Sequence, residues 1–246
     1  MSEKETVYPC IRLNEGQLQD RVLTCGDPAR AKQIAELLDN SKCLVLNREF
    51  HTYYGEWKGV PVNVISHGVG AGGAAIAFES MMKIGIKAIV RVGTCGGMQK
   101  EIGAGSIIIS TGACRDDGVS EKMIPAGYPA VCDTDLVKAL DHAAEARGIP
   151  YFQGITMTNA LLYGSLLGSN VRVYSKANVK AMENELAPLL VLAGIYGVKA
   201  GGILTADAPA FELIDASEYQ PDESVVKQGV ENSILIALDA LASLEV

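Results

Sequence analysis

Two arginines stand where apolar segments give way to glycine-rich turns. Arg91 follows the apolar residues 88–90 in the stretch IVRVGTCGG, and Arg30 closes the stretch CGDPAR. A buried guanidinium is costly unless a carboxylate or a bound oxyanion lies beside it, and its planar fork suits phosphate especially well. Arg91 is therefore either half of a structural Arg–Glu pair or part of an anion site. The second arginine-bearing turn favours the anion site.

Carboxylates also stand at the ends of apolar segments. Asp207 ends the stretch GGILTAD, where burial could raise its pKa and make it a proton donor, although it could equally cap the following turn. Glu183 and Glu185 open an apolar stretch for which we expect a helix. Acidic residues in a first helical turn are favoured by the helix dipole alone, so that explanation suffices for one of these two glutamates.

Several other chemistries are not supported. The stretch SHGVGAGG formally matches G-x-G-x-x-G, but a dinucleotide site also needs an acidic residue about 20 positions further on, where this chain reads AIVRVGT. The three histidines, His51, His67 and His142, show neither metal-ligand spacing nor a nucleophile partner. The six cysteines are scattered without a Cys-x-x-Cys motif, so we expect reduced thiols, no metal site and a cytoplasmic location.

The composition is that of a soluble globular protein. The chain has 246 residues, of which 48% are hydrophobic and 20% charged, and a net charge of −8. The negative charge argues against a nucleic-acid partner, which would need a broad basic face. The N-terminus shows no secretory signal, and the longest apolar stretch, 186–198, is too short to cross a membrane. We expect one domain over residues 1–246.

Strand-like segments alternate with amphipathic helical segments along the chain. The expected strands are 21–24, 43–46, 53–57, 62–66, 88–92, 106–110, 151–157 and 199–205, and the expected helices are 29–38, 73–84, 134–147, 183–196 and 222–244. This order predicts an α/β fold with a mixed, mainly parallel central β-sheet and helices on both faces. Residues 49–57 and 62–66 should form an antiparallel hairpin. Ligands should collect at the carboxyl ends of the strands.

The turns taken together resemble the nucleoside phosphorylase family, in its hexameric branch of purine nucleoside and uridine phosphorylases. The matching fragments run in order through nearly the whole chain: GDPAR (26–30), NRE (47–49), SHGVG (66–70), RVGTCGG (91–97), YSKAN (174–178), ENELA (183–187) and the strand end at Asp207. Each fragment is modest alone, and the ordered set is specific.

The resemblance implies a role for each matched residue. The phosphate pocket would comprise Gly26, Arg30, Arg48, Arg91 and Thr94. The ribose would contact Val69, Asn184, Glu185 and Cys10. The base would contact Leu162, Met182, Glu183 and Asp207. Inorganic phosphate would be the co-substrate, with no metal and no organic cofactor. Arg48 and the N-terminal segment would complete the site of a neighbouring subunit in a homo-oligomer.

The implied reaction is phosphorolysis of purine (deoxy)ribonucleosides to free base and (deoxy)ribose 1-phosphate, with Arg91 holding phosphate and Asp207 protonating the purine. The sequence departs from the family pattern at three positions: Cys10 replaces a histidine, Leu162 replaces an aromatic residue, and Asn184 replaces a methionine. These departures leave open a uridine or 5′-modified nucleoside phosphorylase, or a non-catalytic nucleoside-binding homologue. A water-using nucleosidase is disfavoured, because it would have no use for the arginines.

Overall fold

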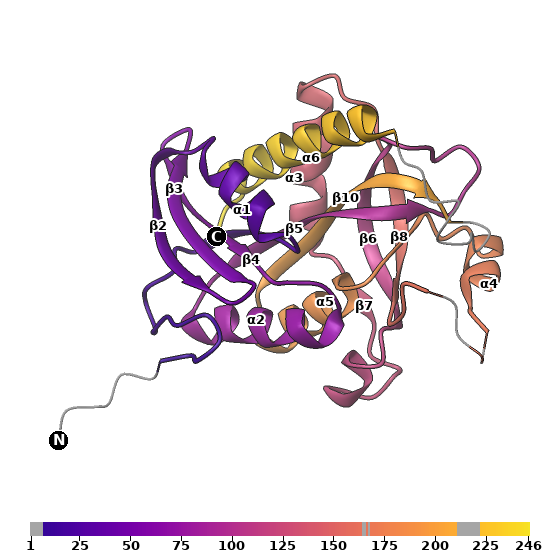
Figure 1. Ribbon diagram of the computed structural model, residues 1–246, viewed down its shortest axis with the longest axis horizontal. Coiled ribbons are helices and arrows are strands. Elements are labelled where there is room, and N and C mark those ends of the chain that lie inside the picture. Colours follow the sequence, from indigo (N-terminus) through magenta and orange to yellow (C-terminus); the bar gives the residue numbers. More distant parts are fainter. Residues whose placement is uncertain (1–6, 164–165, 167, 211–221) are drawn as a thin grey trace.

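Strand β5 (Ala88–Gly97) lies at the centre of the fold, between two parallel neighbours, β1 (Arg21–Cys25) and β10 (Lys199–Pro209) (Figure 1). The first half of β5 is buried throughout, as expected for a parallel strand that is covered on both faces. The computed structural model describes residues 7–163, 166, 168–210 and 222–246.

The remaining strands extend the sheet in two directions. They are β2 (Asp39–Asn47), β3 (Phe50–Trp57), β4 (Val60–Ser66), β6 (Ile107–Asp116), β7 (Ala130–Val131), β8 (Phe152–Asn159) and β9 (Ala181–Glu183). Beyond β1 the order is β4, β3, β2. On the other side β10, β6, β8 and β9 lead back to β5, so these strands close on themselves. The sheet is mixed, with parallel pairs at its centre and antiparallel pairs at β2–β3–β4 and β10–β6.

Helices cover both faces of the sheet, as predicted (Figure 1). They are α1 (Pro28–Ala35), α2 (Ala71–Ile84), α3 (Thr134–Ala146), α4 (Val171–Lys176), α5 (Leu186–Tyr196) and α6 (Glu223–Ser243), with a short 3-10 turn at Ser120–Lys122. Val90 of β5 packs in one core with residues of α1, α3 and α6. Its neighbour Ile89 packs in a second core with residues of α2 and α5. Because successive side chains of β5 point to opposite faces of the sheet, this one strand contributes to both cores.

The predicted hairpin is confirmed. Strands β3 and β4 pair antiparallel up to Trp57 and Val60. The two residues between them, Lys58 and Gly59, have φ values of 53° and 78°. Two positive φ angles are what a tight two-residue turn between twisted strands requires.

Two predicted boundaries are wrong beside the glycine-rich stretch. The strand predicted over 88–92 continues to Gly97, because residues 94–97 still pair with β10. The strand predicted to end at 205 accordingly reaches Pro209. A Cβ on Gly97 would lie 2.3 Å from the carbonyl oxygen of Ile102. The glycines there mark a close backbone approach inside a strand rather than a turn.

The helix predicted from residue 183 begins only at Leu186. Met182 instead pairs with Gly96 of β5, and Glu183 pairs with Thr158 of β8, which makes β9 a short strand between them. Its three residues, like the two of β7 and the six of α4, are too few for a sequence periodicity to show.

Candidate active site

The carboxyl ends of β1, β4, β5 and β10 surround a cavity of about 1140 Å³. Most of the predicted site residues line it, namely Gly26, Arg30, Val69, Arg91, Thr94, Leu162, Met182, Glu183, Asn184, Glu185 and Asp207. The lining also includes residues that sequence reasoning did not assign to the site, among them Glu49, Cys95, Leu161 and Pro209.

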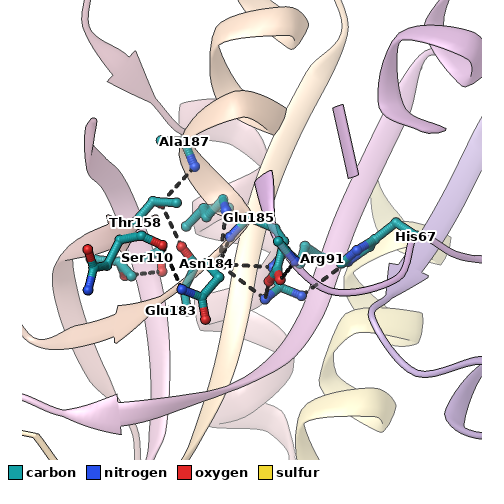
Figure 2. A network of polar contacts seen from close by, with 12 residues as sticks. His67, Arg91, Ser110, Thr158, Glu183, Asn184, Glu185 and Ala187 are labelled. Atoms are coloured by element: carbon teal, nitrogen blue, oxygen red, sulfur yellow. Dashed lines mark hydrogen bonds and ion pairs between the residues drawn. The ribbon is translucent and has the colours of Figure 1, made fainter. Parts of the chain in front are cut away.

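The guanidinium of Arg91 is bound to two carboxylates. Its Nε donates to Glu183 Oε2 at 3.1 Å, and its Nη2 lies 3.1 Å from the same oxygen. Nη2 also donates to Glu185 Oε2, and Figure 2 shows the three side chains converging. Arg91 is only 3% exposed, so a partner was required. The Arg–Glu pairing left open by the sequence is present, and Arg91 still lines the cavity.

Glu183 fixes the start of α5 as well as Arg91. Its Oε2 accepts from the backbone N–H groups of Glu185 and Leu186 at 2.7 and 2.9 Å, and its Oε1 accepts from the hydroxyl of Thr158 at 2.6 Å. Burial raises the pKa of Glu183, and the Arg91 guanidinium opposes that shift. These contacts favour the carboxylate form. Glu183 thus joins Arg91, Thr158 and the start of α5 at the cavity wall.

Glu185 joins Arg91 to the turn between β4 and α2. Its Oε1 accepts from the backbone N–H of Gly70 at 2.6 Å. Two residues earlier, Gly68 has a φ of 75°, and a Cβ there would lie 2.7 Å from the side chain of Glu49. The Val69 side chain between these glycines is 87% exposed and lines the cavity. The glycines of SHGVG therefore allow this tight turn to approach its neighbours.

His67 lies behind Arg91 and was not identified as a site residue from the sequence. Its Nε2 is 3.2 Å from Arg91 Nη1, and its Nδ1 is 2.8 Å from the carbonyl oxygen of Gly68. The ring is fully buried, with an edge-on contact to Phe78 at a centroid distance of 5.1 Å. Burial, then the charge of Arg91, lowers the pKa of His67 well below its ordinary value. The available sequence signal was its place at the end of an apolar strand in SHGVG.

The CGDPAR stretch starts α1 at the cavity, as predicted. Pro28 is the first helical residue, and the side chain of Asp27 caps the helix by accepting from the backbone N–H of Ala29 at 2.8 Å. Arg30 is half-buried and lines the cavity. The positive end of the helix and a guanidinium therefore face the same space.

Asp207 lies inside β10, where the register with β5 shifts between Ala206 and Ala208. Such a bulge re-aims a side chain, and Asp207 lines the cavity. Cys95 of β5 lies opposite Ala206. Burial, together with the nearby Asp207 carboxylate, raises the pKa of the Cys95 thiol well above its ordinary value.

Two leucines and a tyrosine form one wall of the cavity. Leu161 and Leu162 are 51% and 65% exposed, and both line the cavity together with Tyr163. Asn184, which was predicted to contact ribose, donates its side-chain amide to the carbonyl oxygen of Asn159 at 2.6 Å. The Asn184 side chain therefore holds the end of β8, next to this wall.

Arg48 and Cys10 do not line the cavity. Arg48 is exposed in the turn between β2 and β3, with a φ of 52°. The carbonyl of Cys10 accepts from the side-chain amide of Asn47 at 2.6 Å. The two residues predicted to serve a neighbouring subunit therefore lie at the same corner of the molecule. Residues 1–6 of the N-terminal segment are outside the described residues.

The described ranges hold neither a cluster of metal ligands nor a membrane-spanning helix. There, no three His, Cys, Asp or Glu side chains are grouped so that they could hold a metal ion. No helix in that part of the chain is long and apolar enough to cross a membrane.

Comparison with known proteins places these features in a family. The phosphorylase superfamily matches residues 20–242. A purine nucleoside phosphorylase of Plasmodium falciparum is 36% identical over 95% of each chain, and a uridine phosphorylase of Haemophilus influenzae is 30% identical over 95% of this chain and 97% of its own. The crystal structure of a purine nucleoside phosphorylase from Toxoplasma gondii, in complex with immucillin-H, matches with a TM-score of 0.92 and 32% identity, covering 98% of this chain and 97% of that one. The chain belongs to the phosphorylase superfamily.

Proposed function

We propose that this nucleoside phosphorylase, an enzyme of the pentosyltransferase class, cleaves purine ribo- and deoxyribonucleosides with inorganic phosphate, releasing the free base and (deoxy)ribose 1-phosphate. The observation that carries the proposal is that Asp207 lines the same cavity as Arg30 and Arg91. The cavity thus combines a carboxyl group for the base with cationic groups for the phosphate. No metal or organic cofactor has a part in this scheme.

The phosphate would lie between Arg30 and Arg91. Gly26 and Thr94 line the same cavity, and the start of α1 adds the positive end of a helix. Charge-assisted hydrogen bonds from guanidinium groups are among the strongest that proteins form with phosphate. Their role would be to hold the nucleophile in line with the glycosidic bond.

The sugar would lie over Glu185 and Val69. A carboxylate accepts hydrogen bonds from hydroxyl groups, so Glu185 can bind the ribose hydroxyls. Its Oε1 stays on the Gly70 N–H and its Oε2 on Arg91, which keeps the carboxylate oriented.

In the reaction the bond between C1′ and the base nitrogen N9 breaks first, and the electron pair leaves with the base. The positive charge that develops on the sugar is stabilised by the phosphate, whose oxygen then bonds to C1′. Protonated Asp207 donates its proton to N7, so the purine leaves as a neutral molecule. General acid catalysis of this kind contributes about 10²–10⁴-fold to the rate.

Uridine is the second candidate substrate. The similarity to a uridine phosphorylase and Leu162, which stands where the family pattern has an aromatic residue for the base, favour it. A pyrimidine has no N7, however, so with uridine the proton of Asp207 would lack the acceptor atom that a purine offers. A 5′-modified nucleoside is a further alternative, because Cys10 stands where the family pattern has a histidine that reaches the 5′-hydroxyl in the neighbouring subunit.

The complete site would need a second copy of the chain. Arg48 is exposed and outside its own cavity, and Cys10 lies beside it through the contact to Asn47. A homo-oligomer in which this corner reaches the neighbouring cavity would bring a third arginine to the phosphate.

Substitution of Asp207 by asparagine tests the purine assignment. We expect kcat/KM for inosine to fall by about 10²-fold or more, because the proton donor is lost. A purine nucleoside already methylated at N7 needs no such proton and should lose much less. Asp135→Asn, an exposed change on α3, is the control. Equal losses on the two substrates would show that Asp207 is not the proton donor.

A further inference from the structure

His67 connects three strands at the back of the cavity. It follows β4 directly, its backbone N–H donates to the carbonyl of Cys25 at the end of β1, and its ring reaches Arg91 on β5. The ring is fully buried and does not line the cavity. His67 therefore touches Arg91 from within the protein interior rather than from the cavity.

The two neighbours of the ring select one proton arrangement. The carbonyl oxygen of Gly68, 2.8 Å from Nδ1, can only accept, so Nδ1 must carry the proton. Arg91 Nη1, 3.2 Å from Nε2, can only donate, so Nε2 must be the acceptor. A guanidinium has no acceptor atom and a carbonyl has no donor. Both contacts therefore require the same neutral Nδ1–H tautomer.

This acceptor completes the support of Arg91. Glu183 and Glu185 engage Nε and Nη2, whereas His67 engages Nη1. Nη1 carries two N–H bonds, and His67 takes one, so the other is available to an anion in the cavity. We propose that His67 is a positioning residue, which as its neutral Nδ1–H tautomer orients Arg91 Nη1 toward the phosphate of the proposed reaction.

The same ring also supports the sugar side. His67 Nδ1–H donates to the Gly68 carbonyl, and the Gly70 N–H donates to Glu185. Arg91 donates to both Glu185 and His67. The four contacts form a closed circuit through the turn that presents Val69. The two ring nitrogens thus have separate roles: Nε2 positions Arg91 for the phosphate, and Nδ1 positions the turn that lines the sugar side of the cavity.

Three substitutions separate these roles. His67→Phe keeps a ring against Phe78 but removes both contacts. His67→Gln has an amide oxygen that can reach the position of Nε2 and accept from Arg91. His67→Asn has a shorter amide that can still donate to the Gly68 carbonyl but cannot reach Arg91. His142→Gln, an exposed change on α3, is the matched control.

Steady-state kinetics with inosine and varied phosphate provide the first readout, and thermal unfolding of each variant is measured alongside. We expect the phosphate KM to rise about 10-fold or more in His67→Phe and His67→Asn, because a buried donor loses its acceptor. In His67→Gln the phosphate KM should lie close to that of the unsubstituted protein. The inosine KM should change little in His67→Asn. The proposal would be overturned if the phosphate KM rose in proportion to the loss of Tm in every variant, whether or not the residue at position 67 can accept from Arg91.

The second readout does not need activity, which matters because the kinetic test rests on the proposed function. The chain has three histidines, so the ¹⁵N resonances of His67 are identified as those missing from His67→Gln. We expect a protonated Nδ1 and an unprotonated Nε2 at neutral pH. A protonated Nε2 would overturn the positioning role. Absence of phosphate-dependent turnover in the unsubstituted protein, with the Nδ1–H tautomer present, would instead count against the proposed function.

Discussion

At the scale of single residues, the charge balance around Arg91 governs the site. One guanidinium faces two carboxylates, Glu183 and Glu185, so this cluster alone is net negative and would repel an anion. Both glutamates share their charge with backbone N–H groups, which reduces that repulsion. In the proposed reaction, Arg30 and the start of α1 would supply the positive potential that an incoming phosphate needs.

The buried imidazole of His67 predicts a specific pH dependence of stability. In the folded protein the pKa of His67 lies well below its ordinary value, whereas the unfolded chain takes up a proton below about pH 6.5. Below that pH the unfolded state therefore binds more protons, and the free energy of unfolding falls by up to about 1.4 kcal/mol for each further pH unit.

Urea unfolding between about pH 7 and pH 5 measures this slope. His67→Gln should lose less stability on acidification than the unsubstituted protein, whereas His142→Gln should retain nearly the full slope because its side chain is exposed. Identical slopes in all three proteins would mean that His67 does not remain neutral in the folded state.

The sequence identified the wall residues of the cavity better than their supports. Asp207, Arg91 and Arg30 could be found because charged residues after apolar strands are unusual and therefore informative. His67 could not, because its role depends on a contact across β1 that no spacing along the chain reveals. The contact between Asn184 and Asn159 could not be predicted for the same reason, since the two residues are distant in sequence.

At the scale of elements, the short strand β9 and the start of α5 decide where the glutamates point. A helix beginning at residue 183 would turn Glu183 and Glu185 onto different faces, about 200° apart. Pairing of Met182 with β5 delays the helix to Leu186, and both carboxylates then reach Arg91. The α/β order and the hairpin could be predicted from periodicity. The extension of β5 into a glycine-rich stretch could not, because backbone pairing leaves no side-chain pattern there.

Glu183→Gln tests this junction. The change removes a buried negative charge that binds Arg91 and caps α5, so we expect a loss of about 3–5 kcal/mol in the free energy of unfolding. Glu79→Gln is the control, because Glu79 pairs with Lys83 on the surface of α2, where such pairs contribute about 0–1 kcal/mol. Urea unfolding at neutral pH measures both variants. Similar losses for the two would contradict the role given to Glu183.

At the scale of the whole molecule, one corner stands apart from the cavity of its own chain. Arg48 and Cys10 both lie there, beside the β2–β3 turn, although the family resemblance assigns both to a substrate site. A shared site between two copies reconciles these facts.

Mixed assemblies test the shared site. Arg48→Ala and Arg91→Ala should each be nearly inactive alone, because each removes a cationic contact to phosphate. Co-expression should restore part of the activity, since a hybrid pair contains one site with its own Arg91 and the partner subunit's Arg48. Full activity of Arg48→Ala alone, or no recovery in hybrids shown to have formed, would refute the shared arrangement.

Product analysis can establish whether the protein cleaves purine nucleosides in a phosphate-dependent reaction. The purified protein is incubated with inosine, guanosine, adenosine or uridine, each with and without inorganic phosphate, and the bases and sugar phosphates are quantified. We expect a purine base and ribose 1-phosphate to be released together, only when phosphate is present, and uridine to be cleaved far more slowly. Cleavage without phosphate, or of uridine in preference to every purine nucleoside, would contradict this expectation.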